Sequence, residues 1–455
     1  MIRHRIAWLT LAAVATGCTV GPKYKRPDVP APPQFRGAET NPAAASLGEL
    51  KWFDLFQDEA LRKLIQQALA ANYNVLIAAQ RVEEAQGQFQ ATRSALFPQL
   101  NAQGVAARQG TKSPTQSVVG GFGAASWEID LFGKIRRATE AARADLLATK
   151  DNQAAVTIAL VSQVATSYFQ LLEYDAELQY VRESLVQRHK SAELVKARLE
   201  GGVGSKLDYD QALSLVYSAD ASAALLEKGI EQTENQINFL LARPPGPVER
   251  GKILTDQYQP PQVPAGLPSA LLDRRPDVRA SEQQLVAANA RVGVAKAAFF
   301  PSITLTAAGG YQSADLLGIV NRAGFAYSMG GTVDLPIFDA GRRQGNYNTA
   351  KAYYQEILVN YREAVNGAFH DVSDSLVGYQ KAKEYRVAAQ HFTETLRDQS
   401  HMANLRYVGG VSSYLEVLDT ERQRLTGEQQ LAQAERDELL ALVLLYKSLG
   451  GGWQI

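Results

Sequence analysis

The 455-residue sequence predicts a mainly α-helical protein with a small membrane-spanning β part, built as a tandem repeat. Three observations predict this fold class. Two long proline-free tracts carry a helical hydrophobic period, short segments before them alternate apolar and polar residues, and three motifs recur at a spacing of about 200 residues. Together these patterns describe a unit of helix, hairpin, long helix, turn and helix that occurs twice.

Residues 1–17 have the layout of a secretory signal peptide. Arg3, His4 and Arg5 form a basic region, an apolar run of about ten residues follows, and small residues lead up to Cys18. A helix that spans a bilayer needs about twenty residues, so we expect this segment to be cleaved. Cys18 is the only cysteine and resembles the lipid-bearing cysteine of a bacterial lipobox. The alternative is an unmodified thiol in an ordinary signal peptide.

The composition excludes several classes of function. Lys plus Arg and Asp plus Glu number 47 each, so the chain has no net positive charge that would favour binding to nucleic acid. A single cysteine excludes intrachain disulfides and cysteine zinc sites, and the five histidines lack metal-binding spacing. No apolar run after residue 20 approaches the length of a membrane-spanning helix, so we expect any membrane crossing to be made by strands.

Proline marks where long helices can form. None occurs in 115–243 or after residue 336, and an internal proline costs a helix about 3 kcal/mol. Within these tracts apolar residues recur at steps of three or four, which predicts helices of about sixty residues over 137–199 and 342–407. Each would be roughly 90 Å long.

The repeated motifs set the domain limits. Phe97-Pro98 recurs as Phe300-Pro301, residues 128–142 match 332–350, and ARLEGGVGSKLD recurs as LRYVGGVSSYLE. We expect these segments: an extended N-terminal segment (18–51), a first repeat (52–243), a Pro-rich linker (244–268), a second repeat (269–447) and a C-terminal segment (448–455).

Strands are expected over 97–132 and 299–338, where the period changes to two. Their apolar and small polar faces suit a membrane barrel with a wet interior, in which the acidic residues face the lumen. The alternative is a small soluble sheet that caps a helical bundle. Four strands cannot close a barrel, and open edges in lipid cost several kcal/mol for each unpaired group. The chain is therefore expected to oligomerise, with eight strands in a dimer or twelve in a trimer.

No catalytic site is expected. GGVGSK (201–206) fails the phosphate-loop spacing and follows a helix, so we interpret it and GGVSS (409–413) as tight reversals between helices. In these turns Gly would occupy the C′ position, and Ser205 or Ser412 would be the next N-cap. The absence of a serine elbow, histidine pair or metal cluster predicts a protein that is not an enzyme and needs no cofactor.

The second reversal leads into a helix with a distinctive face. Leu415, Asp419 and Arg422 are spaced i, i+4 and i+7 and so lie on one side of that helix. If the face lines a pore, leucines from several subunits could form an apolar plug and aspartates a charged ring. The alternative is a surface Asp-Arg pair beside a core leucine.

The whole chain resembles the TolC-type outer membrane factor family, in its OprM-like (NodT-type) lipoprotein branch that serves RND efflux pumps. The matching stretches follow the chain in order and cover nearly all of it after the signal segment. They are GCTVGPKYKRP, WFDLFQDEALRKLIQQAL, FPQL, WEIDLFGKIRR, LLDRRPDVRASEQQLVAANARVGVAKAAFFPSI, GVSSYLEVLDTER and LYKSLGGGW.

The resemblance implies a homotrimer in the outer membrane, with a twelve-stranded β-barrel and a long α-helical barrel in the periplasm. Such a channel would passively conduct drugs or other toxic small molecules. Its partners would be a periplasmic adaptor and an inner-membrane RND transporter, with outer-membrane lipid around the strands and at Cys18. The alternatives are a channel for type I protein secretion and a periplasm-spanning lipoprotein without a pore.

Site residues follow from the same resemblance. Leu415 would be the apolar constriction of a periplasmic gate, Asp419 its acidic ring, and Tyr407 and Arg422 the network partners. The first repeat keeps Leu207 but has Gln211 and Ser214 at the other two positions, which assigns the gate to the second hairpin. The adaptor would dock on the tips formed by Gly201, Gly202, Val203, Gly204 and Ser205 and by Gly409, Gly410, Val411 and Ser412.

Overall fold

The computed structural model describes residues 19–37, 46–110, 116–257, 268–314 and 324–452. The predicted signal segment and Cys18 lie outside these described residues. The chain divides into two compact units. The first unit takes in 80–151, 279–364 and the described residues before Pro30, and the second takes in the described residues of 30–79, 152–278 and 365–455.

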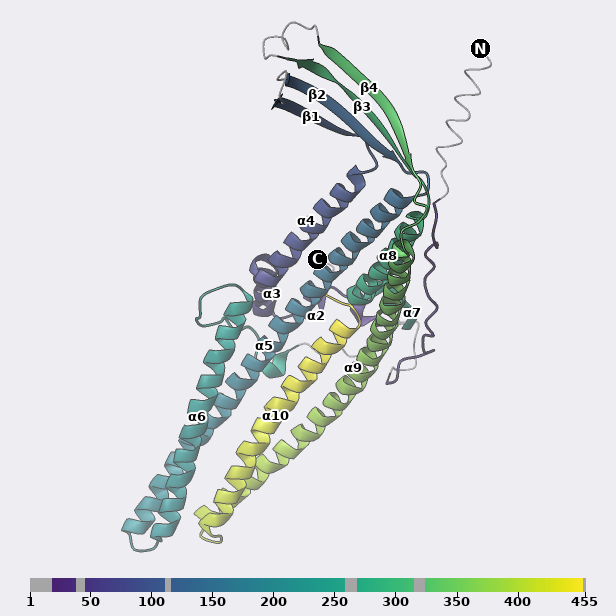
Figure 1. Cartoon of the computed structure of the whole chain (residues 1–455). Coiled ribbons are helices and arrows are strands. Elements are labelled where there is room, and N and C mark those ends of the chain that lie inside the picture. Colours follow the sequence, from purple (N-terminus) through teal and green to yellow (C-terminus); the bar gives the residue numbers. More distant parts are fainter. Residues whose placement is uncertain (1–18, 38–45, 111–115, 258–267, 315–323, 453–455) are drawn as a thin grey trace. The chain divides into compact units, whose positions relative to one another are not determined.

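The first unit carries one antiparallel sheet in the order β1-β2-β3-β4 (Figure 1). Its central pair joins the two repeats, with Ile129 opposite Ile303 and Val119 opposite Ser313. In the part of the chain that the structure describes, neither β1 nor β4 has a partner on its outer edge. The strand bounds are Gln99–Gln109 for β1, Gln116–Ile129 for β2, Ser302–Ser313 for β3 and Phe325–Asp334 for β4.

Asp130 ends β2 instead of facing a lumen from within the strand. Its carboxylate accepts hydrogen bonds from the backbone amides of Ile135 at 3.2 Å and Arg136 at 2.8 Å, and it pairs with the Arg136 guanidinium at 3.2 Å. A carboxylate at a helix N-terminus satisfies amides that have no partner inside the helix. The expectation of a lumen-facing strand residue was therefore wrong for Asp130, because the first turn of the next helix takes its side chain.

Helices α4 (Tyr73–Ser94) and α8 (Pro276–Ala297) are 22 residues each and precede the two Phe-Pro pairs. Alanines let α8 approach α5 (Lys134–Glu200) closely, as Ala141 and Ala144 pack against Ala287 and Ala290. The N-terminal segment is also fixed in this unit. The Val20 amide donates to the Phe132 carbonyl at 3.0 Å, and the Asn289 side chain donates to the Pro22 carbonyl at 3.1 Å.

Two helical hairpins with matching lengths dominate the second unit (Figure 1). Helices α5 (Lys134–Glu200) and α9 (Arg342–Val408) are 67 residues each, and α6 (Lys206–Leu240) and α10 (Tyr414–Ser448) are 35 residues each. The predicted apolar positions form their contacts, and Val164, Tyr168, Val365 and Val372 are fully or almost fully buried. Equal lengths in both halves place the two reversals at equivalent positions of the repeat.

The expectation that no apolar run after residue 20 approaches the length of a membrane-spanning helix was wrong. Within the described residues α5 contains an 18-residue window with a mean hydropathy of 1.4, which is apolar and long enough for a membrane span by composition. Of that window, 56% is buried inside the chain. Core packing of a long helix therefore accounts for its apolar composition.

Asp58 connects three distant segments of the second unit. Its carboxylate accepts hydrogen bonds from the Tyr168 hydroxyl at 2.9 Å, the Lys252 amide at 2.9 Å and the Gln257 side chain at 2.8 Å, and it caps α3 through the amide of Ala60. Burial alone would raise the pKa of Asp58, but these hydrogen bonds outweigh it and hold the pKa below its ordinary value. The short elements of this unit are η1 (Leu47–Glu49), α2 (Trp52–Leu55), α3 (Glu59–Ala71), η2 (Leu254–Asp256) and α7 (Pro268–Arg274).

We predict that Asp58→Asn destabilises this unit by about 2–3 kcal/mol, because an amide cannot accept all the hydrogen bonds that the buried carboxylate accepts. Since the folded pKa is lowered, the wild-type contribution is present at neutral pH and is lost as pH falls through the folded pKa. Thermal unfolding followed by circular dichroism measures the difference. Asp256→Asn, on the exposed side of the same linker, is the control; an equal loss in both variants would contradict the role of Asp58.

Candidate functional site

The candidate site is formed by the reversals at 201–205 and 409–413, where each long helix turns into its shorter partner. In the first, the Gly201 amide donates to Ala197 and the Val203 amide to Arg198; in the second, Gly409 donates to Leu405 and Val411 to Arg406. The central glycines have left-handed backbones, with φ of 76° at Gly202 and 73° at Gly410. Both turns are glycine C-caps of the kind that satisfies the last carbonyls of a helix.

The two turns differ in how the next helix is capped. Ser205 is the N-cap of α6, and its hydroxyl accepts from the amides of Leu207 at 3.0 Å and Asp208 at 3.4 Å. At the second turn the N-cap is Ser413, whose side chain makes no capping hydrogen bond. The expectation that Ser412 would cap α10 was wrong, because this helix begins at Tyr414 and Ser412 is the counterpart of Gly204.

A hydrophobic tip cluster holds the ends of both hairpins together. It comprises Ala192, Val195, Ala212, Val216, Tyr407, Tyr414 and Val417, contributed by α5, α6, α9 and α10. The rings of Tyr407 and Tyr414 lie 5.2 Å apart between centroids. The Arg198 guanidinium lies 4.5 Å from the centroid of the Tyr407 ring, in cation–π geometry between α5 and α9. The first hairpin is thereby attached to the second.

Sequence reasoning missed Arg198 and Tyr414. Arg198 is the counterpart of Arg406 in the repeat, and Arg406 pairs with Glu416 at 3.2 Å at the second turn. The repeat alignment therefore held a signal for a basic residue at this position. The repeat alignment held no signal for the contact of Arg198 with the Tyr407 ring, because this contact joins two hairpins that are about 200 residues apart in sequence.

The predicted gate residues on α10 project away from the tip cluster. The side chain of Leu415 is 63% exposed, so it is not the core leucine of the alternative interpretation. Asp419 accepts hydrogen bonds from Arg422 at 3.1 Å and from Gln423 at 2.6 Å, and the Asp419–Arg422 ion pair is largely exposed. The structure thus brings Asp419 and Arg422 together on the face that carries Leu415.

Tyr407 lies apart from this pair. It is buried in the tip cluster, where Arg198 is its cationic neighbour and Tyr414 its aromatic neighbour. Among the described residues no contact joins it to Asp419 or Arg422. Its contribution to the site is to attach α9 to α5.

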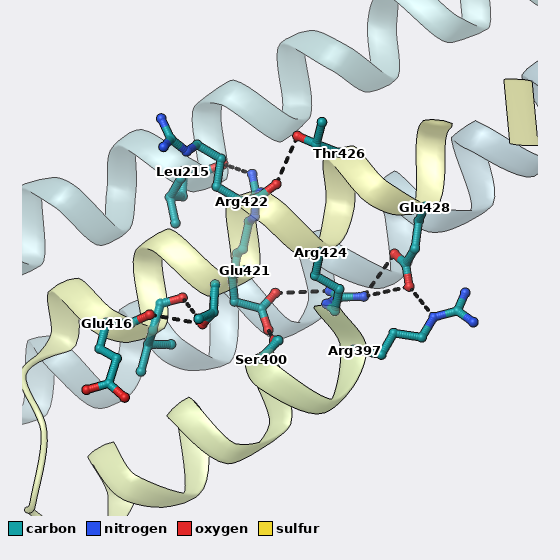
Figure 2. A network of polar contacts seen from close by, with 12 residues as sticks. Leu215, Arg397, Ser400, Glu416, Glu421, Arg422, Arg424, Thr426 and Glu428 are labelled. Carbon is teal, nitrogen blue, oxygen red and sulfur yellow. Dashed lines mark hydrogen bonds and ion pairs between the residues drawn. The ribbon is translucent and has the colours of Figure 1, made fainter. Parts of the chain in front are cut away.

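A polar crevice of about 620 Å³ lies between the hairpins beside the tip cluster. Figure 2 shows its network, in which Glu421 accepts from Ser400 at 2.5 Å and Arg424 at 3.0 Å, and Glu428 pairs with Arg397 at 2.9 Å. Arg188 also lines it, is buried, and donates to the Leu215 carbonyl at 2.7 Å. Burial lowers the pKa of Arg188 against the opposing effect of Glu421. Within each hairpin the long helix and its shorter partner therefore meet through polar contacts as well as apolar ones.

Among the described residues, no group of three or more His, Cys, Asp or Glu side chains is placed to hold a metal ion. The site consists of exposed apolar and charged side chains on a rigid helical scaffold. Such an arrangement can bind a partner surface or line a passage.

Comparison with known proteins gives full-length matches. The model of a family described as outer membrane efflux protein matches residues 64–243 and 267–451. The cation efflux system protein CusC of Escherichia coli O6:H1 is 35% identical over 98% of both chains. The probable outer membrane lipoprotein SilC of Salmonella typhimurium is 33% identical over 100% of both chains. The open state of the Neisseria gonorrhoeae MtrE outer membrane channel has a TM-score of 0.90 at 32% identity, covering 96% of this chain and 99% of that one.

The two caps make a matched pair of variants. We predict that Ser205→Ala destabilises the start of α6 by about 1 kcal/mol, because two amides lose their acceptor. Ser413→Ala should change the stability of the first turn of α10 by less than about 0.5 kcal/mol, since no capping hydrogen bond is lost. Amide hydrogen exchange at 206–209 and at 414–417 measures both, and equal effects at the two turns would contradict the assignment.

Proposed function

The chain belongs to the outer membrane efflux protein family, and on that basis we propose that it is the outer-membrane channel of a tripartite efflux pump. It would conduct drugs or other toxic small molecules passively from an inner-membrane transporter of the RND class and a periplasmic adaptor to the exterior. The observation that carries the proposal is the similarity to efflux channels over nearly the whole chain, sheet and hairpins included. CusC is a cation efflux system protein and the matching family is described as outer membrane efflux protein, which favours efflux over type I protein secretion.

The open sheet edges support closure of the sheet by further copies of the chain, and the family resemblance makes that oligomer a homotrimer. β1 and β4 would each leave a row of backbone groups without partners, which lipid does not tolerate. Pairing β4 of one copy with β1 of the next closes a ring, and three copies give twelve strands. The exposed side chains of β4, among them Tyr327 at 76% and Met329 at 82%, would then contact lipid or line the interior.

The α10 face supports a gate at the periplasmic tips. In a trimer the exposed Leu415 side chains would form an apolar constriction, and the Asp419 carboxylates an acidic ring beside it. The contact of Arg198 with Tyr407 holds the second hairpin to the first. Opening would require the tip helices to untwist, and Arg198 would have to keep or exchange its aromatic partner.

The reversals themselves supply a surface for an adaptor. Val203 is 81% exposed and Val411 is 70% exposed, and each stands at the apex of a glycine turn. Apolar side chains on a fixed backbone can bind a partner helix at a low entropy cost, because little of the chain has to be ordered on binding. This supports docking at Gly201–Gly204 and Ser205 and at Gly409, Gly410, Val411 and Ser412.

A deletion strain tests the function as a whole. Loss of the gene should make the cell hypersensitive to toxic small molecules, and the purified protein should give ion conductance in planar bilayers. A periplasm-spanning lipoprotein without a pore would show neither effect. Export of a protein toxin, lost on deletion while drug sensitivity stays unchanged, would favour type I secretion.

The gate residues generate a direct prediction. Asp419→Ala and Leu415→Ala should each raise leak conductance several-fold in planar bilayers, because each removes part of the constriction. Gln211→Ala is the matched control, since Gln211 is the counterpart of Asp419 in the first hairpin. Unchanged conductance in both gate variants, or an equal rise in the control, would remove the assignment.

The lipid anchor is tested at Cys18. Thr19, the first described residue, lies against Gly133 at the boundary between β2 and α5, so the tether would add to a segment that is already fixed. We predict that Cys18→Ser, exported with an alternative signal, loses acylation and still forms trimers. Mass spectrometry of the mature N-terminus and native gel electrophoresis measure the two properties. Complete loss of trimers would show that the tether is needed for assembly.

A further inference from the structure

Two buried glutamates face α10 from successive turns of α5. Glu173 is 2% exposed and Glu177 is 5% exposed. The Gln433 side chain donates to Glu177 at 2.8 Å, and the Arg436 guanidinium lies 3.2 Å from Glu173. Because α5 belongs to the first repeat and α10 to the second, these carboxylates lie on the contact between the repeats.

The cations around this pair do not balance its charge. From α10, Arg436 is the cation that faces it. The same guanidinium also pairs with Asp437 at 2.7 Å and donates to the side-chain oxygen of Gln170 at 3.1 Å. On α5, Gln170 donates to Glu173, while Asp175 pairs with Arg250 at 2.9 Å. Two buried carboxylates therefore share less than one full positive charge. A buried, uncompensated carboxylate is costly, and a bound proton removes that cost.

We propose that Glu173 is protonated in the folded chain and donates a hydrogen bond to Glu177, and that this proton stabilises the contact between α5 and α10. Two carboxyl groups one helical turn apart can share a proton in a hydrogen bond that two ionised groups cannot make. The proposal stands on the charges and burial at this contact and does not depend on the transport function.

The direction of the pH effect follows from the pKa of Glu173. Burial raises the pKa of Glu173 to about 7, Arg436 opposes this increase, and repulsion from Glu177 adds to it. In the unfolded chain the value is 4.5. The folded state therefore binds more protons between these two values, so stability falls as pH rises from about 4.5 to about 7 and levels off above that. In a protein that faces the periplasm, external pH would act directly on the contact between the repeats.

The experiment compares the full-length wild-type protein with Glu173→Gln, Glu177→Gln and the control Glu183→Gln in detergent. Glu183 is exposed on the same helix. The midpoint of thermal unfolding is measured from about pH 5 to pH 8. Wild type and Glu183→Gln should lose thermal stability over this range. Glu173→Gln should lose less and should exceed wild type at pH 8, because a neutral amide keeps the hydrogen bonds without the charge.

Infrared difference spectroscopy gives a readout that does not require equal stability of the variants. The carbonyl stretch of a protonated carboxylic acid should titrate near neutral pH in wild type and in Glu183→Gln. The band should vanish in Glu173→Gln. In Glu177→Gln its titration should move to lower pH, because the like charge beside Glu173 is gone. Absence of such a band in the wild type between pH 5 and pH 8, or its persistence at the same pH in both pair variants, would overturn the proposal.

Discussion

The long helices depend on lateral packing along their whole length. A helix of 67 residues is far longer than the average in globular proteins, and helical stability in water comes mainly from a buried apolar face. In the second unit that face is provided by the shorter partner helix and by the other hairpin, with residues such as Val164, Val365 and Tyr168 in the contact. The glycine turns, the tip cluster and the polar crevice all lie near the ends of the hairpins, where the lateral packing of the long helices stops.

The two repeats keep the same backbone and differ in side chains. Both reversals use the same hydrogen bonds and a left-handed glycine. At the first turn a serine hydroxyl caps the helix, whereas at the second the aromatic pair of Tyr407 and Tyr414 packs beside an uncapped start. The ion pair of Asp419 with Arg422 likewise occurs on one hairpin only, since the other has Gln211 and Ser214. The shared backbone thus supports two chemically distinct tips.

Local patterns predicted the architecture, and tertiary contacts supplied what the patterns could not. The tandem repeat and both glycine turns follow from proline spacing, periodicity and self-similarity, because these signals are local. The contact of Arg198 with Tyr407 and the hydrogen bonds to Asp58 join residues more than 100 positions apart, so no local pattern contains them. Asp130 was assigned to the strand because alternation continues through it, although its carboxylate is bound by the helix that follows.

The pairing of β2 with β3 is the seam at which the two repeats became one sheet. A single repeat contributes two strands, so an unfused ancestor would have needed six copies to build the twelve-stranded ring that three present chains would make. Six identical copies would also carry six identical tips. Fusion of two copies reduces the symmetry from sixfold to threefold, and alternate hairpins around the ring become free to evolve separately. Gln211 and Asp419 are one pair of equivalent positions at which the two hairpins already differ.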